Sequence, residues 1–234
     1  LTIDNQQERE FYAELCQHEN WSTRALKEKI ASRLFQRTAL SKHPDTLIEK
    51  ELKALRKGQT ISPALILRDP YILDFLQLPG QFSESDLEQA ILNELSLFLH
   101  ELGSDFCFIA RQKRISIGKK DHYLDLLFYH RTLRRLIALE LKLDAFQPAH
   151  KGQMELYLKW LDKNERRPGE EAPLGIILCA QKDQEEIELL ELNKSDIHVA
   201  EYWLSFPSKE WLEEKLQLAI TLAKERLIEQ KTIE

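Results

Sequence analysis

Residues 135–143 form the stretch that most restricts how this chain can fold. The segment RLIALELKL is apolar on both faces except for Glu140 and Lys142. A strand that is apolar on both faces is usually central in a sheet. Side chains alternate along a strand, so Glu140 and Lys142 point to one face while Leu141 points to the other. The segment predicts a central strand that carries an acid and a lysine on one face.

An acid and a lysine in an apolar strand cost free energy unless they are paired or functional. The E-x-K spacing of this pair is weak by itself, because it occurs three more times in the chain. Those three copies fall on stretches with helical periodicity: Glu51/Lys53, Glu213/Lys215 and Glu229/Lys231. Spacing alone leaves two interpretations of Glu140 and Lys142 open, a buried structural ion pair and a chemical site.

The preceding strand brings a second acid to this pair. Residues 123–142, YLDLLFYHRTLRRLIALELK, predict two strands joined by a short basic turn, with Asp125 on the first. Two carboxylates suit a divalent metal at a phosphodiester, since Mg²⁺ prefers oxygen ligands and often takes only one or two carboxylates from the protein. The carbonyl of Leu141 is a candidate third oxygen. Lys142 would position or deprotonate the attacking water, its pKa being depressed by the neighbouring cation.

The rest of the chain predicts helices first and a mixed layer afterwards. Residues 1–80 predict helices and no strand, and the Pro79–Gly80 break marks a boundary between regions 1–80 and 81–234. From Ser83, with Asp86 in a capping-box arrangement, the order is helix, three strands, helix, strand, helix, strand, helix. This order predicts an α/β fold with helices covering a central sheet. The expected strands are 105–111 with 113–117, 122–129, 135–143, 173–179 and 198–204, and the expected helices are 6–17, 22–34, 45–57, 71–78, 83–102, 148–163, 184–192 and one from 207.

Composition narrows the functional classes. The formal net charge of −6 argues against non-specific coating of nucleic acid, although a local basic patch can still hold a backbone. We find no apolar run of the ~20 residues that a membrane span needs and no signal peptide. Cys16, Cys107 and Cys179 show no zinc spacing and are interpreted as reduced thiols of a cytosolic protein, the last two on buried strands. Because the first residue is leucine, we expect a piece of a longer protein.

Four segments, together with the D-x14-E-x-K spacing, resemble the YhcG-like bacterial family of the PD-(D/E)xK nuclease superfamily. They are DLEQAILNELSLFLHELGSDFCFIARQ, YLDLLFYHRTLRRLIALELK, FQPAHKGQMELYLKWLD and GIILC, and residues 10–78 resemble the region before that family's nuclease domain. The resemblance implies a restriction-endonuclease-like αβββαβ core with a central mixed sheet flanked by helices. A small all-helical region for targeting or oligomerisation would precede it.

The resemblance also implies site residues. Asp125, Glu140 and Lys142 match the catalytic set, although Leu124 stands where the superfamily motif has proline. Glu88 matches the acid of the first helix, and Gln153 a glutamine of the following helix that contacts substrate or the lysine. The metal ligands would be Asp125, Glu140, the Leu141 carbonyl and Glu88. The expected nucleic-acid contacts are Arg111, Gln112, Arg114, His130 and Lys151.

The resulting hypothesis is a cytoplasmic Mg²⁺-dependent nuclease, with Mn²⁺ as a substitute, that acts on DNA. The resemblance favours an endonuclease over an exonuclease and includes branched or structured DNA among its substrates. A homodimer or higher oligomer and a protein partner of the N-terminal helical region are further expectations, and a membrane is not. Two alternatives stay open: a non-catalytic nucleic-acid- or protein-binding module that keeps the fold, and an RNA-directed nuclease.

Overall fold

A computed structural model describes residues 67–103, 105–192 and 195–205, together with 22–31 and residues 3, 8–9, 12–13 and 16. The chain divides into two compact units, residues 1–60 with 207–234, and residues 61–206. In the first unit, helix α2 (Thr23–Ala31) follows Ser22, as its capping position predicts. The expected helices at 45–57 and from 207 lie outside the described residues. The second unit contains the sheet, and it includes residues 61–80, which the sequence assigned to the helical region.

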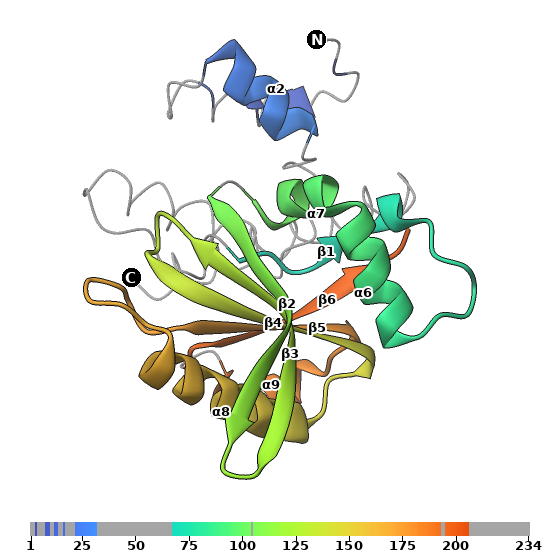
Figure 1. Cartoon of the computed structure of the whole chain (residues 1–234). Helices are drawn as coiled ribbons and strands as arrows, with labels where there is room; N and C mark the ends of the chain where they lie inside the picture. The colour runs from blue at the N-terminus through green and yellow to red at the C-terminus, as the bar shows by residue number, and fades with distance from the viewer. Residues whose placement is uncertain are drawn as a thin grey trace, which may run out of the picture. The chain divides into compact units, whose positions relative to one another are not determined.

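The second unit is built on a six-stranded mixed sheet of order β1-β6-β5-β4-β3-β2 (Figure 1). Strands β2, β3 and β4 form an antiparallel meander, while β4, β5, β6 and β1 run parallel. The predicted central strand is confirmed, since β4 lies between β3 and β5. The strands are β1 (Tyr71–Ile72), β2 (Phe106–Ile117), β3 (Lys120–His130), β4 (Arg135–Ala145), β5 (Leu174–Gln181) and β6 (Ile197–Trp203).

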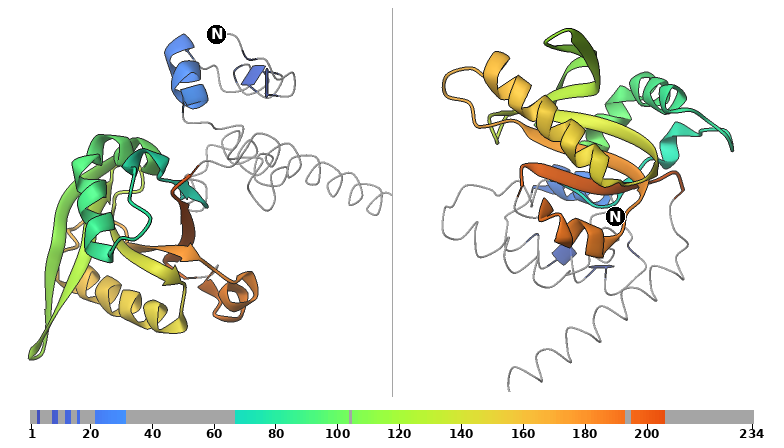
Figure 2. Two further views of the ribbon diagram at one scale, coloured as in Figure 1. Left: turned by 90° about the vertical axis from the view of Figure 1, so that its right-hand side faces the viewer. Right: turned by 90° about the horizontal axis from the view of Figure 1, so that it is seen from below.

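Helices cover both faces of the sheet, as Figure 2 shows. Helices α6 (Glu84–Asn93) and α7 (Leu95–Leu102) pack on one face through a cluster that includes Leu87, Ile91 and Phe98. Helices α8 (Pro148–Asn164) and α9 (Gln184–Leu189) pack on the other. The order from α6 to β5 is the αβββαβ core that the resemblance implies. Among the described residues, no helix combines the length and apolar character needed to cross a bilayer.

A glycine lets α8 approach the sheet closely. A Cβ atom added at Gly175 of β5 would lie 2.5 Å from the Cγ of Met154, which is fully buried on α8. Such a contact is far shorter than a normal van der Waals separation, so any larger residue would push the helix outward. Since α8 also carries Gln153, the spacing between α8 and β5 helps to set the position of that candidate residue.

Helix α6 begins as the sequence predicts. Ser83 accepts a hydrogen bond from the backbone N–H of Asp86, and the Asp86 carboxylate accepts one from the backbone N–H of Ser83, 2.8 Å away. The single expected helix is instead two, because Glu94 leaves the helical conformation between α6 and α7. Gly103, with φ of +125°, ends α7 where the sequence places the stop.

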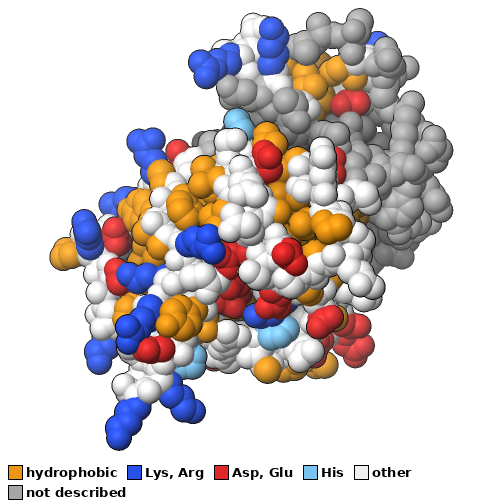
Figure 3. Space-filling model, turned by 45° about the vertical axis from the view of Figure 1, so that its right-hand side comes forward, with side chains coloured by type: hydrophobic (Ala, Val, Ile, Leu, Met, Phe, Trp, Pro, Cys, Tyr) orange, Lys and Arg blue, Asp and Glu red, His pale blue; other side chains and the backbone are white. Residues whose placement is uncertain are grey.

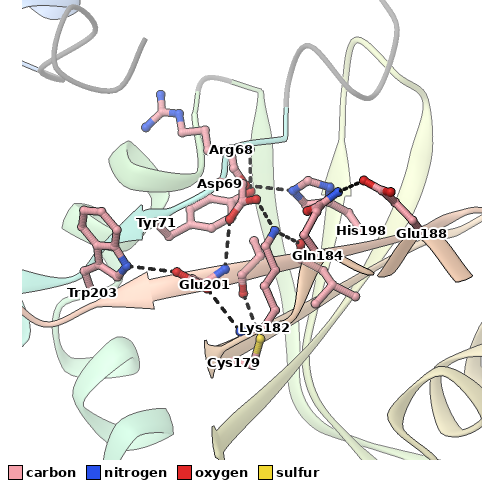
Figure 4. A network of polar contacts seen from close by, with 12 residues as sticks. Arg68, Asp69, Tyr71, Cys179, Lys182, Gln184, Glu188, His198, Glu201 and Trp203 are labelled. Carbon is pink, nitrogen blue, oxygen red and sulfur yellow. Dashed lines mark hydrogen bonds and ion pairs between the residues drawn. The ribbon is translucent and has the colours of Figure 1, made fainter. Parts of the chain in front are cut away.

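The prediction of no strand before residue 80 is wrong, and the expected helix at 71–78 is wrong with it. Tyr71 and Ile72 form β1 beside β6, and only a 3₁₀ turn (Asp74–Leu76) follows. A polar network holds the preceding loop against the sheet (Figure 4). In it, the backbone N–H of Glu201 donates to Asp69 over 3.1 Å, and Lys182 contacts the same carboxylate. These contacts are remote in sequence, so local periodicity could not report them.

Strand β2 runs through the break that the sequence predicts between two shorter strands. Gln112, the residue between them, has a left-handed φ of +43° inside the continuous strand. The pairing of β3 with β4 stops at Leu126, but β2 and β3 remain paired out to Ile117 and Lys120. We call residues 113–124 the hairpin arm, because this part of the β2–β3 hairpin lies beyond the last residue of β3 that pairs with β4. Cys107 on β2 is exposed, which corrects the expectation that it is buried.

Candidate active site

Strands β3 and β4 bring the predicted acids together where their pairing ends. Leu126 and Leu139 form the last residue pair. Asp125, just before Leu126, and Glu140, just after Leu139, therefore stand where the pairing of the two strands ends. The backbone N–H of Leu141 donates to Asp125 Oδ2 over 2.8 Å, which fixes that carboxylate. The carbonyl of Leu141 was predicted from the sequence to be a metal ligand, and that role stays a prediction.

Glu140 has the most perturbed environment of the set. Its side chain is 5% exposed, and its Oε1 atom is buried without a hydrogen bond. Burial, and then the charge of Asp125, raise the pKa of Glu140 to about 8. Burial also raises the pKa of Asp125, although the Leu141 N–H and Lys142 act in the opposite direction. Burial is therefore the main reason that both carboxyl groups resist ionisation, and for Glu140 the charge of Asp125 adds to it.

Lys142 places a positive charge beside these two carboxyl groups. Its Nζ atom lies 3.2 Å from Glu140 Oε2, and 16% of its side chain is exposed. Burial alone would lower the pKa of Lys142, but Glu140, Glu84 and Asp125 more than compensate and raise it. The lysine is therefore an ammonium at neutral pH. A depressed pKa, which the water-deprotonating role requires, would need a cation beside it.

Helix α6 contributes Glu88 to the same place. Glu88 is 5% exposed, and Gln112 Nε2 donates both to its Oε2 atom and, over 3.1 Å, to Asp125 Oδ1. Arg111 Nη2 lies 3.3 Å from Glu88 Oε1, which accepts no hydrogen bond. One glutamine amide therefore links the acid of the first helix to the acid of β3. From the sequence, Glu88 was predicted to be a metal ligand together with Asp125, whereas Gln112 and Arg111 were predicted to contact the nucleic acid.

The donor set fits a divalent cation. Glu88 Oε1 and Glu140 Oε1 are buried acceptors with no hydrogen-bond donor, and Asp125 lies beside both residues. Within the described ranges, no three His, Cys, Asp or Glu side chains form a ready-made metal cage. Magnesium does not need one, because waters and a substrate phosphate commonly complete its octahedral shell.

Gln153 forms a hydrogen bond with Tyr157, a residue whose pKa responds to the charges of Glu140 and Asp125. Its Nε2 atom donates to the hydroxyl of Tyr157 over 2.8 Å, one helical turn along α8. Burial raises the pKa of Tyr157, and the charges of Glu140 and Asp125 add to the shift. Tyr157 was not among the predicted site residues, and it is also buried in the hydrophobic cluster under α8. The i, i+4 spacing from Gln153 was the signal that could have paired them.

Glu84 was also missed. It lies one turn before Glu88 on α6, and its charge acts on Lys142 and His150. The same i, i+4 spacing on one helix face was the available signal here.

The remaining predicted nucleic-acid contacts differ in accessibility. Arg114 is 64% exposed and pairs with Asp121 over 2.9 Å. Lys151 is half-buried and donates to the carbonyl of Leu190 over 3.1 Å. His130 is 1% exposed, with its ring packed edge-on against Phe106 at 4.7 Å, so its side chain offers no surface to a nucleic acid in this conformation.

The described surface shows the corresponding charge pattern (Figure 3). Asp and Glu side chains gather near the middle of the face, next to Lys, Arg and His side chains. Lys and Arg side chains line one border and the protruding tip below. Acidic and basic regions are therefore adjacent on one face, even though the chain as a whole is acidic.

Comparison with known proteins places the chain in a family. Residues 64–218 match the model of the YhcG PDDEXK nuclease domain. The YhcG protein of Escherichia coli (strain K12) is 35% identical over 217 residues, which are 92% of this chain and 57% of that protein. The chain thus spans a little over half the length of that relative.

Solved structures give weaker similarities. A repair endonuclease from Pyrococcus abyssi has a TM-score of 0.39 and 20% identity, covering 53% of this chain and 48% of that one. An EndoMS–dsDNA complex has a TM-score of 0.39 and 17% identity, covering 56% and 49%. The family model alone covers more than half of the chain, and it shows that the chain belongs to the YhcG family of PD-(D/E)xK nucleases.

Proposed function

We propose that this chain hydrolyses phosphodiester bonds of DNA with Mg²⁺, or Mn²⁺ in its place, held by Asp125 and Glu140. The observation that carries the proposal is the buried Glu140, whose pKa is raised to about 8 beside a second acid and a lysine. A structural ion pair would not need a second carboxylate at the same point. Strongly perturbed acids that cluster with a charged partner are typical of catalytic sites.

Each protein group has a defined task in this proposal. A bound Mg²⁺ polarises a phosphoryl oxygen and lowers the pKa of a water molecule. Asp125 and Glu140 would hold the cation, and Glu88 would accept hydrogen bonds from its water shell. The Lys142 ammonium would orient the attacking water and offset charge on the phosphate. Its raised pKa favours these roles over that of a general base.

The decisive experiment is digestion of supercoiled plasmid with Mg²⁺ or Mn²⁺ by the wild type and by the D125N and K142Q variants. We expect cleavage to fall by roughly 10²–10⁴-fold in each variant, the range for loss of an electrostatic or proton-transfer group. Exposed residues of the same type serve as controls, so E185Q on α9 and K159Q on α8 should cleave like the wild type. Cooperative melting of all variants would show that they fold.

Two results would contradict the proposal. Undiminished cleavage by both D125N and K142Q would contradict the site. Absence of Mg²⁺ and Mn²⁺ binding by calorimetry, with nucleic-acid binding retained, would indicate a non-catalytic module on a nuclease fold.

The substrate follows from the same assay. Single-stranded, duplex and branched DNA are digested beside RNA of the same sequence, with DNA as the expected substrate. Preferential cleavage of RNA would reassign the enzyme as a ribonuclease. Nicked circles followed by linear product would support an endonuclease, whereas gradual shortening from free ends would contradict one.

We further propose a cytoplasmic enzyme that works as a homodimer or higher oligomer, with residues 1–80 providing contacts to a second copy or to a protein partner. The free thiols of Cys107 and Cys179 agree with a reducing compartment. Two copies would supply the two sites that a double-strand cut needs. Light scattering on the full chain measures the mass, and a monomer at working concentration would contradict the oligomer.

A further inference from the structure

We propose that the hairpin arm, residues 113–124, grips the phosphate backbone of duplex DNA beside the cleaved bond. This inference rests on the proposed nuclease function and names the element that holds the substrate. The arm contains four Lys or Arg residues and one Asp, a net charge of +3, in a chain whose net charge is −6. Positive charge is thus concentrated on a projecting element of an otherwise acidic protein.

The arm is held in place by α8. Ile115 and Leu124 are fully buried in the cluster between the sheet and α8. Trp160 donates to the carbonyl of Ser116 over 3.1 Å, and Lys113 pairs with Glu165 over 2.7 Å. A two-stranded ribbon alone is marginally stable in water, so this support keeps the arm in one conformation before substrate arrives. A preformed arm loses little entropy when it binds.

The other face of the arm is open and continues from the candidate site. Arg114 is directly opposite Tyr123, and these side chains are 64% and 51% exposed. Tyr123 lies two residues before Asp125 on β3, so the open face of the arm begins beside the carboxylates along the same strand. A backbone held against Arg114 and Tyr123 would therefore lead towards the carboxylates. This continuity distinguishes the arm from a basic turn at an arbitrary place on the surface.

The tip carries two further cations. Gly118, with φ of +61°, opens the two-residue turn, and Lys119 and Lys120 are exposed beside it. Five residues per strand span about 17 Å, which corresponds to roughly five base pairs of B-DNA. A two-stranded ribbon also has dimensions that the major groove accepts. The arm therefore fits a duplex over several base pairs better than a single flexible strand.

The test measures binding of a fluorescent 30-base-pair duplex across a salt series, in the D125N background so that cleavage is strongly reduced. Removing both tip lysines (K119A/K120A) should weaken binding on the order of tenfold and reduce the salt slope by roughly two, since each lost phosphate contact lowers it by about 0.9. The matched control, K159A/K163A, removes two exposed lysines from α8 and should keep the parental slope. In the active enzyme, the arm variant should raise KM and leave kcat unchanged.

Several outcomes would overturn the proposal. An unchanged slope in K119A/K120A, or an equal loss in K159A/K163A, would exclude a specific role of the arm. An equal loss on the single-stranded oligonucleotide would exclude the duplex assignment. If the wild type cleaves duplex DNA while the arm variant keeps its KM, only the arm proposal fails. If the wild type neither binds nor cleaves DNA, the proposed nuclease function fails first and the arm proposal with it.

Discussion

At the scale of single residues, Gln112 is the least expected member of the site. A non-glycine residue with positive φ inside a strand costs free energy, and such residues concentrate at functional sites. Here the left-handed conformation accompanies an amide that donates to Glu88 and to Asp125 at once. We interpret Gln112 as a positioning residue, because it holds the two acids in one arrangement without being a ligand itself.

Replacing Gln112 with alanine and with glycine separates the amide from the backbone. Both variants lose the amide, so we expect Mn²⁺ affinity and kcat to fall by roughly tenfold in each. Glycine adopts positive φ without strain, so Q112G should be more stable than Q112A by about 1 kcal/mol. Calorimetry and thermal melting give the two quantities. Metal affinity that follows stability across the pair, and not loss of the amide, would contradict the positioning role.

The sequence predicted the acids of the site but not how they are held. Asp125, Glu140 and Lys142 were identified because charged residues in an apolar strand are conspicuous, and the register of β3 and β4 then brings them together. The bond from Gln112 to Glu88 joins residues 24 positions apart on a strand and a helix. No periodicity encodes that approach, which depends on how α6 packs against the sheet.

At the scale of elements, local signals predicted most boundaries and failed where tertiary contacts decide. Ser83 with Asp86 and Gly103 placed the ends of the helical segment, since caps act within a few residues. The break at Glu94 and the pairing of β1 with β6 were missed. The two residues of β1 are a strand because Trp203 and Tyr202 lie beside them, not because of their own pattern.

The capping box of α6 tests whether this helix matters to the site. Loss of the cap in S83A should cost about 1 kcal/mol and lower Tm by roughly 2–4 °C. Because α6 carries Glu88, we also expect weaker Mn²⁺ binding by calorimetry. The matched control is D183A, which removes the acceptor of the Glu185 N–H, 2.8 Å away, at the start of α9. It should lose similar stability and keep its metal affinity. Equal metal affinity in both variants would separate α6 from the site.

At the scale of the whole molecule, stability and the charge of the site are linked. The folded protein keeps a proton on Glu140 up to about pH 8, whereas the unfolded chain releases it near the ordinary value of 4.5. The folded state therefore binds more protons between these two values, and the free energy of unfolding must fall as pH rises through that window. Asp125 acts with the same sign, and Lys142, whose pKa is raised, stays protonated in both states there.

Metal-free wild type should accordingly lose stability from about pH 5 to pH 8, by on the order of a few kcal/mol at most. The E140Q variant cannot ionise at this position, so its melting temperature should vary less with pH and should exceed that of the wild type at pH 9. At pH 5, where Glu140 is neutral, the two should melt alike. Mn²⁺ at pH 8 should stabilise the wild type and not E140Q, since only the wild type offers the carboxylate. E185Q, altered at an exposed acid, should follow the wild type throughout. Parallel profiles for wild type and E140Q would mean that Glu140 ionises freely in the fold, and the electrostatic basis for a cation at this site would be lost.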